Sequence, residues 1–367
     1  WSLIVNGTPL EFESIVANKE REPDVGEVWR PFDILPPVFV EITESFYLSK
    51  GENIPVTVRV KANRDNVKGN VVLRSPKGWP STAAGGKSPT IELTKKGDIV
   101  EYTFDLQPQG GPDFVKLSAG FEIDDQKYGS RLVTINYEHI PRQYVMLPAE
   151  AHAARVDLKV TSKNVGYYMG AGDDGPDALR HMGCTVTLLD DKDMAAENLR
   201  RFDAVVIGIR AYNTKDALAQ QQIQLMEYVQ RGGTVVTQYN TSYNMVLEDL
   251  GTYPLKLGRD RVTDEKAEIR FLKADHPALN TPNKITAKDF ENWVQERGLY
   301  FPAEWDTHYT ALLSSNDPDE SPADGSLLVA PYGNGYFVYT GLSFFRQFPA
   351  GVPGAYRLFA NLISLKM

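Results

Sequence analysis

The sequence predicts two domains of different class, an N-terminal β-sandwich followed by an α/β domain with a mostly parallel sheet. The length of 367 residues suits two domains, because a single domain averages roughly 150 residues. Residues 38–140 contain short runs of alternating apolar and polar residues, separated by Gly, Asn and Pro turns, which is typical of antiparallel strands. Residues 161–367 alternate apolar runs with helical patterns, which indicates βαβ units.

The composition excludes several classes of function. The net charge is −9 and the pI is about 5.2, which disfavours nucleic-acid binding because phosphate contacts need a basic surface. No apolar run approaches the roughly 18 residues of a membrane span. A single cysteine, Cys184, excludes an intrachain disulfide and a Cys-based zinc cage. The first residue is Trp1 rather than Met, and we expect the chain to be a piece of a longer protein.

The first 140 residues divide into a linker and the sandwich. Residues 1–37 are predicted to be an extended linker, because the segment is charged and ends in Pro36-Pro37, which a helix does not accommodate. Strands are expected at 54–60, where every second residue is apolar, and at 100–106, with a turn at Ala84-Gly85-Gly86 between them. The sandwich is expected to be of immunoglobulin or fibronectin type, without the disulfide signature.

The second half reads as alternating strands and helices after a linker at 141–160. A strand at 164–169 leads to a helix that Pro176 opens and Gly183 closes, with Asp173 or Asp174 as N-cap. Further elements are expected in the following order: strands at 185–189, 203–208 and 234–237, with a helix at 216–231 before the last of them, then a short helix at 289–297, a strand at 335–341 and a closing helix at 353–365.

Polar residues follow several of these strands, at the edge where open α/β sheets bind ligands. Four segments should converge there, namely 170–174, 209–213, 238–244 and 342–346. Side chains with bidentate donors or aromatic faces suit a sugar or another polar metabolite. The candidate ligand-binding residues are Asp173, Asp174, Arg210, Tyr212, Asn213, Tyr239, Asn240 and Arg346. The alternative is structural, with an Asp that caps the helix and pairs with Arg210.

The sequence contains no complete cofactor-binding or metal-binding motif. The loop 170–175 has the spacing of a phosphate-binding G-x-G-x-x-G, but its two aspartates would repel a pyrophosphate. The five histidines form no zinc motif. Cys184 begins a strand directly after Gly183, a position typical of a buried, inert thiol. We therefore expect no cofactor and no metal.

The second half resembles class I glutamine amidotransferase-like domains, a flavodoxin-like fold that includes the ThuA-like proteins. The resemblance covers about 160–367 and rests on the strand 202–208, on 332–341 with its Gly-x-Gly turn, and on 275–279. In that family a nucleophilic Cys follows the fourth strand, where this chain has Tyr239 or Asn240. The family's catalytic His would fall near 341–346, which contains none. The resemblance therefore implies a domain without glutaminase activity.

The domain order is also similar to the C-terminal half of bacterial LmbE/PIG-L-type (GlcNAc de-N-acetylase-like) proteins, and 208–213 and 289–300 resemble that subgroup. The sandwich, with 76–80 after a strand, resembles accessory sandwich domains of bacterial sugar-active enzymes. These resemblances imply an upstream zinc deacetylase domain as partner, a role in carbohydrate processing and a periplasmic or secreted location. Three functions stay open: a non-catalytic accessory region, a sugar-binding module that uses Arg210, Tyr212 and Tyr239, and an enzyme in which Asp173 and Asp174 divide acid and base roles beside Arg346.

Overall fold

The computed structural model describes residues 1–83, 86 and 89–367. The chain forms two compact units. The first comprises Trp1–Ser45 and Asn53–Ala151, and the second comprises Phe46–Glu52 and His152–Met367. The expected turn at Ala84-Gly85-Gly86 lies almost entirely outside the described residues. Among the residues described, no helix is long and apolar enough to cross a membrane.

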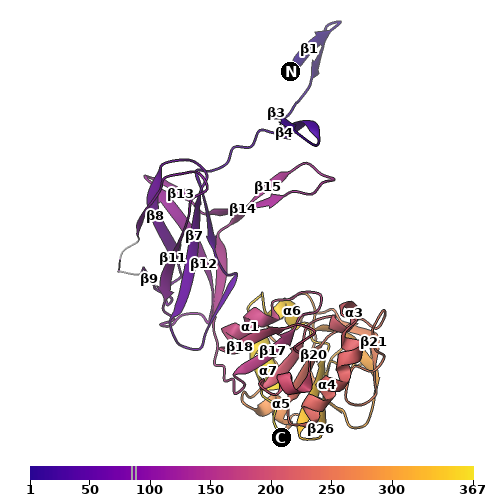
Figure 1. Ribbon diagram of the computed structural model, residues 1–367. Helices are drawn as coiled ribbons and strands as arrows, with labels where there is room; N and C mark the ends of the chain where they lie inside the picture. The colour runs from indigo at the N-terminus through magenta and orange to yellow at the C-terminus, as the bar shows by residue number, and fades with distance from the viewer. Residues whose placement is uncertain (84–85, 87–88) are drawn as a thin grey trace. The chain divides into compact units, whose positions relative to one another are not determined.

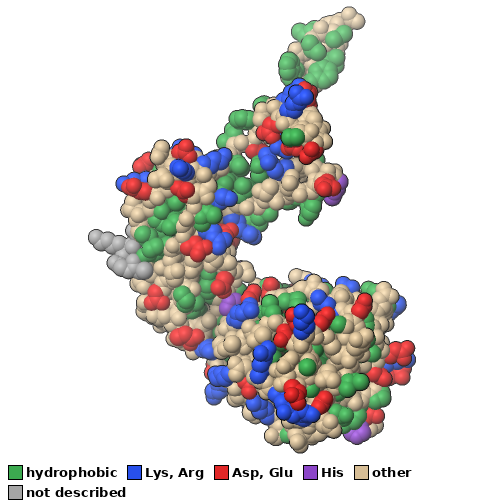
Figure 2. Space-filling model, in the orientation of Figure 1, with side chains coloured by type: hydrophobic (Ala, Val, Ile, Leu, Met, Phe, Trp, Pro, Cys, Tyr) green, Lys and Arg blue, Asp and Glu red, His purple; other side chains and the backbone are tan. Residues whose placement is uncertain are grey.

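The segment 1–37, predicted to be an extended linker, instead contains two exposed hairpins. They are β1 (Ser2–Val5) with β2 (Thr8–Glu11), and β3 (Ala17–Glu22) with β4 (Gly26–Pro31). Asn6 and Gly7 both have positive φ, which is the two-residue Asn-Gly turn that matches the twist of a hairpin. Hydrophobic side chains gather on this segment (Figure 2), and Trp1, Ile15 and Ile34 are more than four-fifths exposed.

Two antiparallel strand systems form the rest of the first unit (Figure 1). One has the order β5-β7-β11-β9, and the other includes β10-β8-β12 with β13 beside β12, while β14 and β15 form a separate hairpin. Alternate residues of β7 are buried, as the predicted two-residue period requires. The strands are β5 (Val38–Ile42), β7 (Ile54–Ala62), β8 (Val67–Arg74), β9 (Ser81–Ala83), β10 (Thr90–Leu93), β11 (Ile99–Leu106), β12 (Phe114–Ile123), β13 (Gln126–Tyr128), β14 (Ser130–Ile135) and β15 (Gln143–Pro148).

The second unit is built on a mixed sheet with the order β18-β17-β19-β20-β27-β26-β24. The first five strands are parallel, β26 pairs antiparallel with β27, and β24 pairs antiparallel with β26. Counted along the chain, the parallel strands have the order 2-1-3-4-5, a doubly wound arrangement whose switch point lies between β17 and β19. The strands are β17 (Asn164–Tyr168), β18 (Thr185–Leu189), β19 (Ala204–Ile207), β20 (Thr234–Gln238), β24 (Thr310–Ala311), β26 (Leu327–Tyr332) and β27 (Gly335–Thr340).

Helices cover both faces of this sheet. Consecutive residues of β17 point to opposite sides, so that Tyr167 packs in the core with α7 and Tyr168 in the core with α4. Pro176 opens α1, as predicted. The helices are α1 (Gly175–His181), α2 (Ala196–Leu199), α3 (Ala211–Thr214), α4 (Leu218–Gln230), α5 (Pro277–Asn280), α6 (Phe344–Gln347) and α7 (Pro353–Ile363).

Smaller elements complete the second unit. The predicted helix at 289–297 is replaced by a 3-10 turn, η1 (Ala287–Phe290), and an irregular loop in which Asn292 and Gln295 have positive φ. Positive φ does not propagate a right-handed helix, which ends the pattern early. The remaining strand pairs are β21 (Leu255–Val262) with β23 (Gly298–Trp305), β22 (Arg270–Phe271) with β25 (Leu313–Ser314), and β6 (Phe46–Ser49) in parallel with residues His152–Arg155 of β16 (Glu150–Arg155).

Candidate functional site

The four predicted segments meet at the carboxyl edge of the parallel strands. The loop after β17 approaches the loop after β19 so closely that a Cβ on Gly170 would lie 2.1 Å from the carbonyl oxygen of Ile209. The backbone N–H of Arg210 donates to the carbonyl of Tyr239 at 2.8 Å, which ties the loop after β19 to the loop after β20. The aromatic ring of Tyr239 in turn lies 5.1 Å from that of Phe345, which follows β27. Glycine is required at position 170 because any larger residue would separate these loops.

Asp173 is held entirely by the fold. Its Oδ1 accepts hydrogen bonds from the Tyr167 hydroxyl at 2.5 Å and from the backbone N–H of Gly175 at 2.8 Å, and its Oδ2 accepts from the N–H of Ile209 at 3.1 Å. The amide of Gln238 donates to the same Tyr167 hydroxyl at 2.8 Å. Burial raises the pKa of Tyr167 well above its ordinary value, and the Asp173 carboxylate adds to this effect, so that the phenol stays a donor.

Asp174 occupies the N-cap position of α1 but makes no capping hydrogen bond with its side chain. The residue is exposed. Partial burial raises the pKa of its carboxyl group, and the neighbouring Asp177 and Asp173 carboxylates raise it further. The two aspartates that the sequence grouped together therefore have different surroundings, one engaged on both oxygens and one at the surface.

Tyr212, Asn213 and Asn240 connect the loops rather than line an open surface. Tyr212 and Asn240 are fully buried. The Oδ1 of Asn240 accepts from the backbone N–H of Tyr212 at 2.9 Å, and the Tyr212 hydroxyl donates to Gln222 at 2.5 Å. The Asn213 amide donates to the carbonyls of Thr241 at 3.1 Å and Tyr243 at 3.0 Å. Of the eight predicted residues, Arg210, Tyr239 and Arg346 remain as candidates, and they belong to one group of aromatic and guanidinium side chains.

That group is an arrangement of aromatic rings and guanidinium groups, here called the mouth cluster and defined as Arg210, Tyr239, Tyr300, Phe345 and Arg346. The rings of Tyr239 and Tyr300 are nearly parallel, with centroids 6.4 Å apart. Burial raises the pKa of Tyr239, while the charges of Arg210 and Arg346 lower it. Arg210 and Tyr300 both have φ in the left-handed region, at 54° and 52°. Such strained residues concentrate at ligand sites.

The Arg210 side chain is the unusual member of the cluster. Its Nε is shielded from solvent and has no hydrogen-bond partner. Across the described ranges, its guanidinium group also makes no ion pair. A buried N–H without an acceptor costs about 1–3 kcal/mol, so most such groups have a partner. Arg210 is thus a donor without an acceptor among the described residues.

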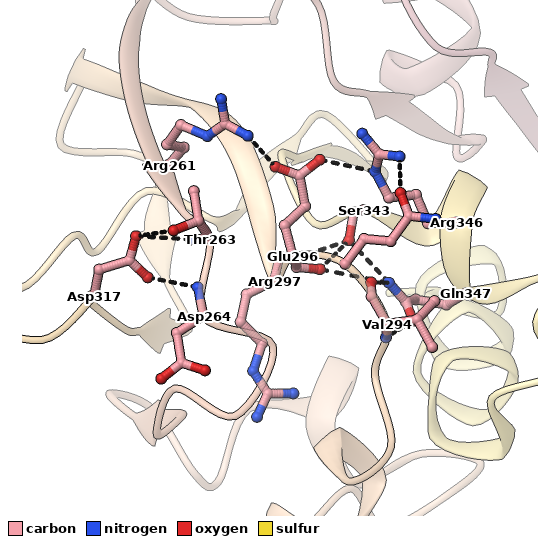
Figure 3. A network of polar contacts seen from close by, with 11 residues as sticks. Arg261, Thr263, Asp264, Val294, Glu296, Arg297, Asp317, Ser343, Arg346 and Gln347 are labelled. Atoms are coloured by element: carbon pink, nitrogen blue, oxygen red, sulfur yellow. Dashed lines mark hydrogen bonds and ion pairs between the residues drawn. The ribbon is translucent and has the colours of Figure 1, made fainter.

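Arg346 is positioned by a carboxylate that the sequence did not single out. Glu296 is 2% exposed and pairs with Arg261 at 2.7 Å and with Arg346 at 2.8 Å. Figure 3 shows its carboxylate between the two guanidinium groups. The Arg346 side chain also donates to Gln295, and the Ser343 hydroxyl donates to the carbonyl of Glu296 at 2.6 Å. Two cations face one carboxylate, so this triad keeps an excess positive charge.

Sequence reasoning missed Glu296, Arg261 and Tyr300. Glu296 lies in the irregular loop where a helix was expected, and Tyr300 and Arg261 belong to the antiparallel pair β21–β23 rather than to the parallel strands. The available signal was the polar segment Gln295-Glu296-Arg297 beside apolar neighbours. That signal does not say which parallel strand the loop approaches.

The Cys and His side chains of the amidotransferase reaction do not occur in the loops after β20 and β27. Tyr239 and Asn240 follow β20, and Ser343 follows β27. Cys184 is buried, as predicted, and burial raises its pKa to about 11, which keeps the thiol protonated. His276 caps α5 by accepting a hydrogen bond from the N–H of Ala278 at 3.1 Å. Within residues 1–83, 86 and 89–367, no group of three His, Cys, Asp or Glu residues is placed to hold a metal ion.

Comparisons with known proteins give distant structural matches. No protein-family model matches the chain, and no curated protein matches it. Among solved structures, a ThuA-like protein from Bacteroides uniformis is 12% identical, with 56% of this chain and 92% of that chain covered and a TM-score of 0.36. A cold-adapted β-galactosidase from Rahnella sp. R3 is 17% identical, with 56% and 31% covered and a TM-score of 0.33. A xyloglucanase from Bacteroides ovatus is 9% identical, with 55% and 45% covered and a TM-score of 0.19.

Proposed function

We propose that the second unit is a non-catalytic binding module whose mouth cluster takes a small sugar that carries a carboxylate, such as a hexuronate. The observation that carries this proposal is the guanidinium group of Arg210, which has a solvent-shielded N–H and no acceptor among the described residues. A ligand carboxylate is the acceptor that fits, because a guanidinium group presents paired N–H donors in the geometry of a carboxylate.

The remainder of the mouth cluster suits the ring of a sugar. Tyr300 and Phe345, which pack on the buried ring of Tyr239, are only partly buried and present apolar surface against which C–H groups of a pyranose can pack, and Tyr243 adds an exposed phenol beside Tyr300. Arg346 is a second cation whose orientation Glu296 fixes before any ligand arrives. Donors held in place in this way lose little conformational entropy on binding.

The wider context is part of the same proposal. We infer an accessory role in a larger carbohydrate-processing protein, with a fibronectin-like sandwich in the first unit and a flavodoxin-like domain in the second. The absence of a cysteine and a histidine from the mouth cluster supports a binding role over acyl transfer. The three hydrogen bonds on Asp173 favour a structural role over an acid–base role. The upstream de-N-acetylase domain stays a prediction.

Calorimetric titration of the full chain with galacturonate and glucuronate, and with galactose and glucose as neutral controls, tests the proposal. We expect binding of one or both uronates and about a tenfold weaker affinity after Arg210→Gln, since a hydrogen bond to a charged group contributes about 1.5–3 kcal/mol. Arg231→Gln, at the opposite edge of the sheet, is the matched control and should not change the affinity. Equal affinity for neutral sugars, no binding of any of the four, or an unaltered Arg210 variant would overturn the proposal.

A further inference from the structure

A groove of about 730 Å³ lies on the first unit and shares no residue with the mouth cluster. Its lining includes Arg59, Lys61, Lys96 and Arg131, with Glu41 as its single acidic side chain among the lining residues described. The protein as a whole carries a charge of −9. The groove therefore carries more cations than carboxylates although the protein as a whole is acidic, a feature that attracts anions at short range.

The strand register explains how the charge is arranged. On the solvent face of the sheet, Lys61 of β7 stands between Phe39 of β5 and Ile99 of β11. The next row along the same face is Glu41, Arg59 and Glu101. Arg59 donates to Glu41 at 2.6 Å and to Glu101 at 2.7 Å. Because two carboxylates neutralise Arg59, the excess charge of the groove comes from the three other cations.

Those three cations, Lys61, Lys96 and Arg131, have no ion pair and no side-chain hydrogen bond within the part of the chain that the structure describes. Elsewhere on the same unit, Lys68 pairs with Glu92, and Lys127 lies 3.6 Å from Glu122. The carboxylates nearest in sequence to Lys96 are occupied, since Asp98 accepts from the backbone N–H groups of Thr94 and Lys95. A groove with spare cations between paired neighbours is the pattern of a site for an anionic ligand.

The groove is only partly charged. The exposed side chain of Ile99 and the side chain of Leu132 supply apolar surface, and Asn63 and Thr134 supply an amide and a hydroxyl group. Apolar patches beside hydrogen-bonding groups and cations match the C–H faces, hydroxyls and carboxylates of sugar acids. Clusters of cations also bind acidic peptide motifs, so the test below includes an acidic peptide as the competing probe. Three cations are too few for the broad basic footprint of a nucleic-acid site.

We propose that this groove binds an acidic oligosaccharide, with uronate carboxylates at Lys61, Lys96 and Arg131 and a sugar face against Ile99. The site is separate from the mouth cluster and does not depend on it. A protein with both sites would bind an acidic oligosaccharide on the sandwich and a single acidic sugar on the α/β domain. The groove is tested in a variant whose mouth cluster is weakened.

The experiment measures binding of trigalacturonate to the full chain in the Arg210→Gln background, in which binding at the mouth cluster is expected to be about tenfold weaker. Maltotriose is the neutral probe of equal length. We expect trigalacturonate to bind and maltotriose not to bind. The additional variant Lys61→Gln/Arg131→Gln should weaken binding at least tenfold, because it removes two of the three cations that the proposal assigns to the uronate carboxylates. Binding should also weaken as salt rises, since exposed charges are screened.

The matched control is Lys68→Gln/Lys127→Gln, which removes two cations from the same unit outside the groove and should leave the affinity within about twofold, since surface ion pairs contribute little. Thermal unfolding of both variants shows whether the sandwich is intact. Hexaglutamate is the competing probe. No binding of trigalacturonate, equal weakening by the control, or tighter binding of hexaglutamate than of trigalacturonate would overturn the proposal, the last by assigning the groove to an acidic peptide.

Discussion

Asp173 and Arg210 follow neighbouring strands of one sheet, yet the fold treats their charges in opposite ways. The carboxylate of Asp173 accepts three hydrogen bonds from its own chain. The guanidinium group of Arg210 is partly buried and has a shielded N–H without any acceptor. Asp173 therefore holds the loops at the strand ends together, whereas the Arg210 side chain keeps a donor that the fold does not use. The difference teaches that a polar residue at a strand end becomes a site candidate only when its hydrogen-bonding capacity exceeds what the fold uses.

The carboxylate of Glu296 is held by two cations, and removing both should cause the largest loss in the free energy of unfolding. The double variant Arg261→Ala/Arg346→Ala leaves a carboxylate that is 2% exposed without either cation. Removing the partners of a buried charge costs about 3–5 kcal/mol. We expect the free energy of unfolding of the second unit, measured by urea titration, to fall by about 3 kcal/mol. Arg180→Ala/Arg231→Ala removes two exposed helix pairs and should cost about 1 kcal/mol or less; equal losses in the two double variants would contradict this account.

Asp173→Ala should have the next largest effect. The variant removes the acceptor of the Tyr167 hydroxyl and of two backbone N–H groups, and it leaves the phenol donor buried without a partner. A loss of about 2–3 kcal/mol in the free energy of unfolding follows, because each unsatisfied buried donor costs about 1–3 kcal/mol. Urea titration of the variant measures it.

Asp174→Ala is the adjacent control for that measurement. The fold raises the pKa of the Asp174 carboxyl, so the stability it contributes is present below the pH of its unfolded titration and is lost as the pH rises. At about pH 7 its removal should therefore leave stability unchanged or slightly higher, within about 0.5 kcal/mol. A loss as large as that of Asp173→Ala would show that the two aspartates act alike, against the contrast drawn from their contacts.

Sequence patterns predicted the parts of this arrangement that depend on local periodicity. The apolar runs of β17, β19 and β20 identify parallel strands, and parallel strands must present their carboxyl ends at one edge, so the meeting of four loops followed. The Asn6-Gly7 hairpin carried a readable turn signal, which the proline-based interpretation of 1–37 overlooked.

The sequence could not predict which polar side chains at the strand ends have hydrogen-bond partners and which do not. Whether Asn240 or Arg210 has a free hydrogen-bonding group depends on partners that are distant in sequence. The clearest case is Glu296, which meets Arg346 across 50 positions through a loop whose positive-φ residues, Asn292 and Gln295, interrupt the expected helix. No periodic pattern encodes such a contact.

A smaller effect is expected from pH through His276. Burial lowers the pKa of this imidazole, and its Nδ1 must be unprotonated to accept the N–H of Ala278. A lowered pKa in the folded state means that the stabilisation is present above the unfolded value of about 6.5 and is lost as the pH falls below it. His276→Asn keeps a capping oxygen. Its free energy of unfolding should fall less than that of the wild type between about pH 7 and pH 5; parallel curves would contradict the prediction.

Arg210→Gln should have the smallest effect on stability, and this expectation bears most directly on the contrast with Asp173. Among described residues the guanidinium group has no hydrogen bond or ion pair to lose, and glutamine carries the same left-handed backbone strain at φ 54°. The free energy of unfolding should therefore fall by no more than about 0.5 kcal/mol, and removal of the buried unpartnered N–H favours an increase.

Arg297→Gln provides the matched comparison for Arg210→Gln. The buried Arg297 donates to the carbonyls of Ala267 and Phe290, so its removal should cost about 2 kcal/mol. If Arg210→Gln were as costly as Arg297→Gln, Arg210 would belong with Asp173 among the residues that assemble the mouth, and the donor on which the proposed uronate site depends would already be in use.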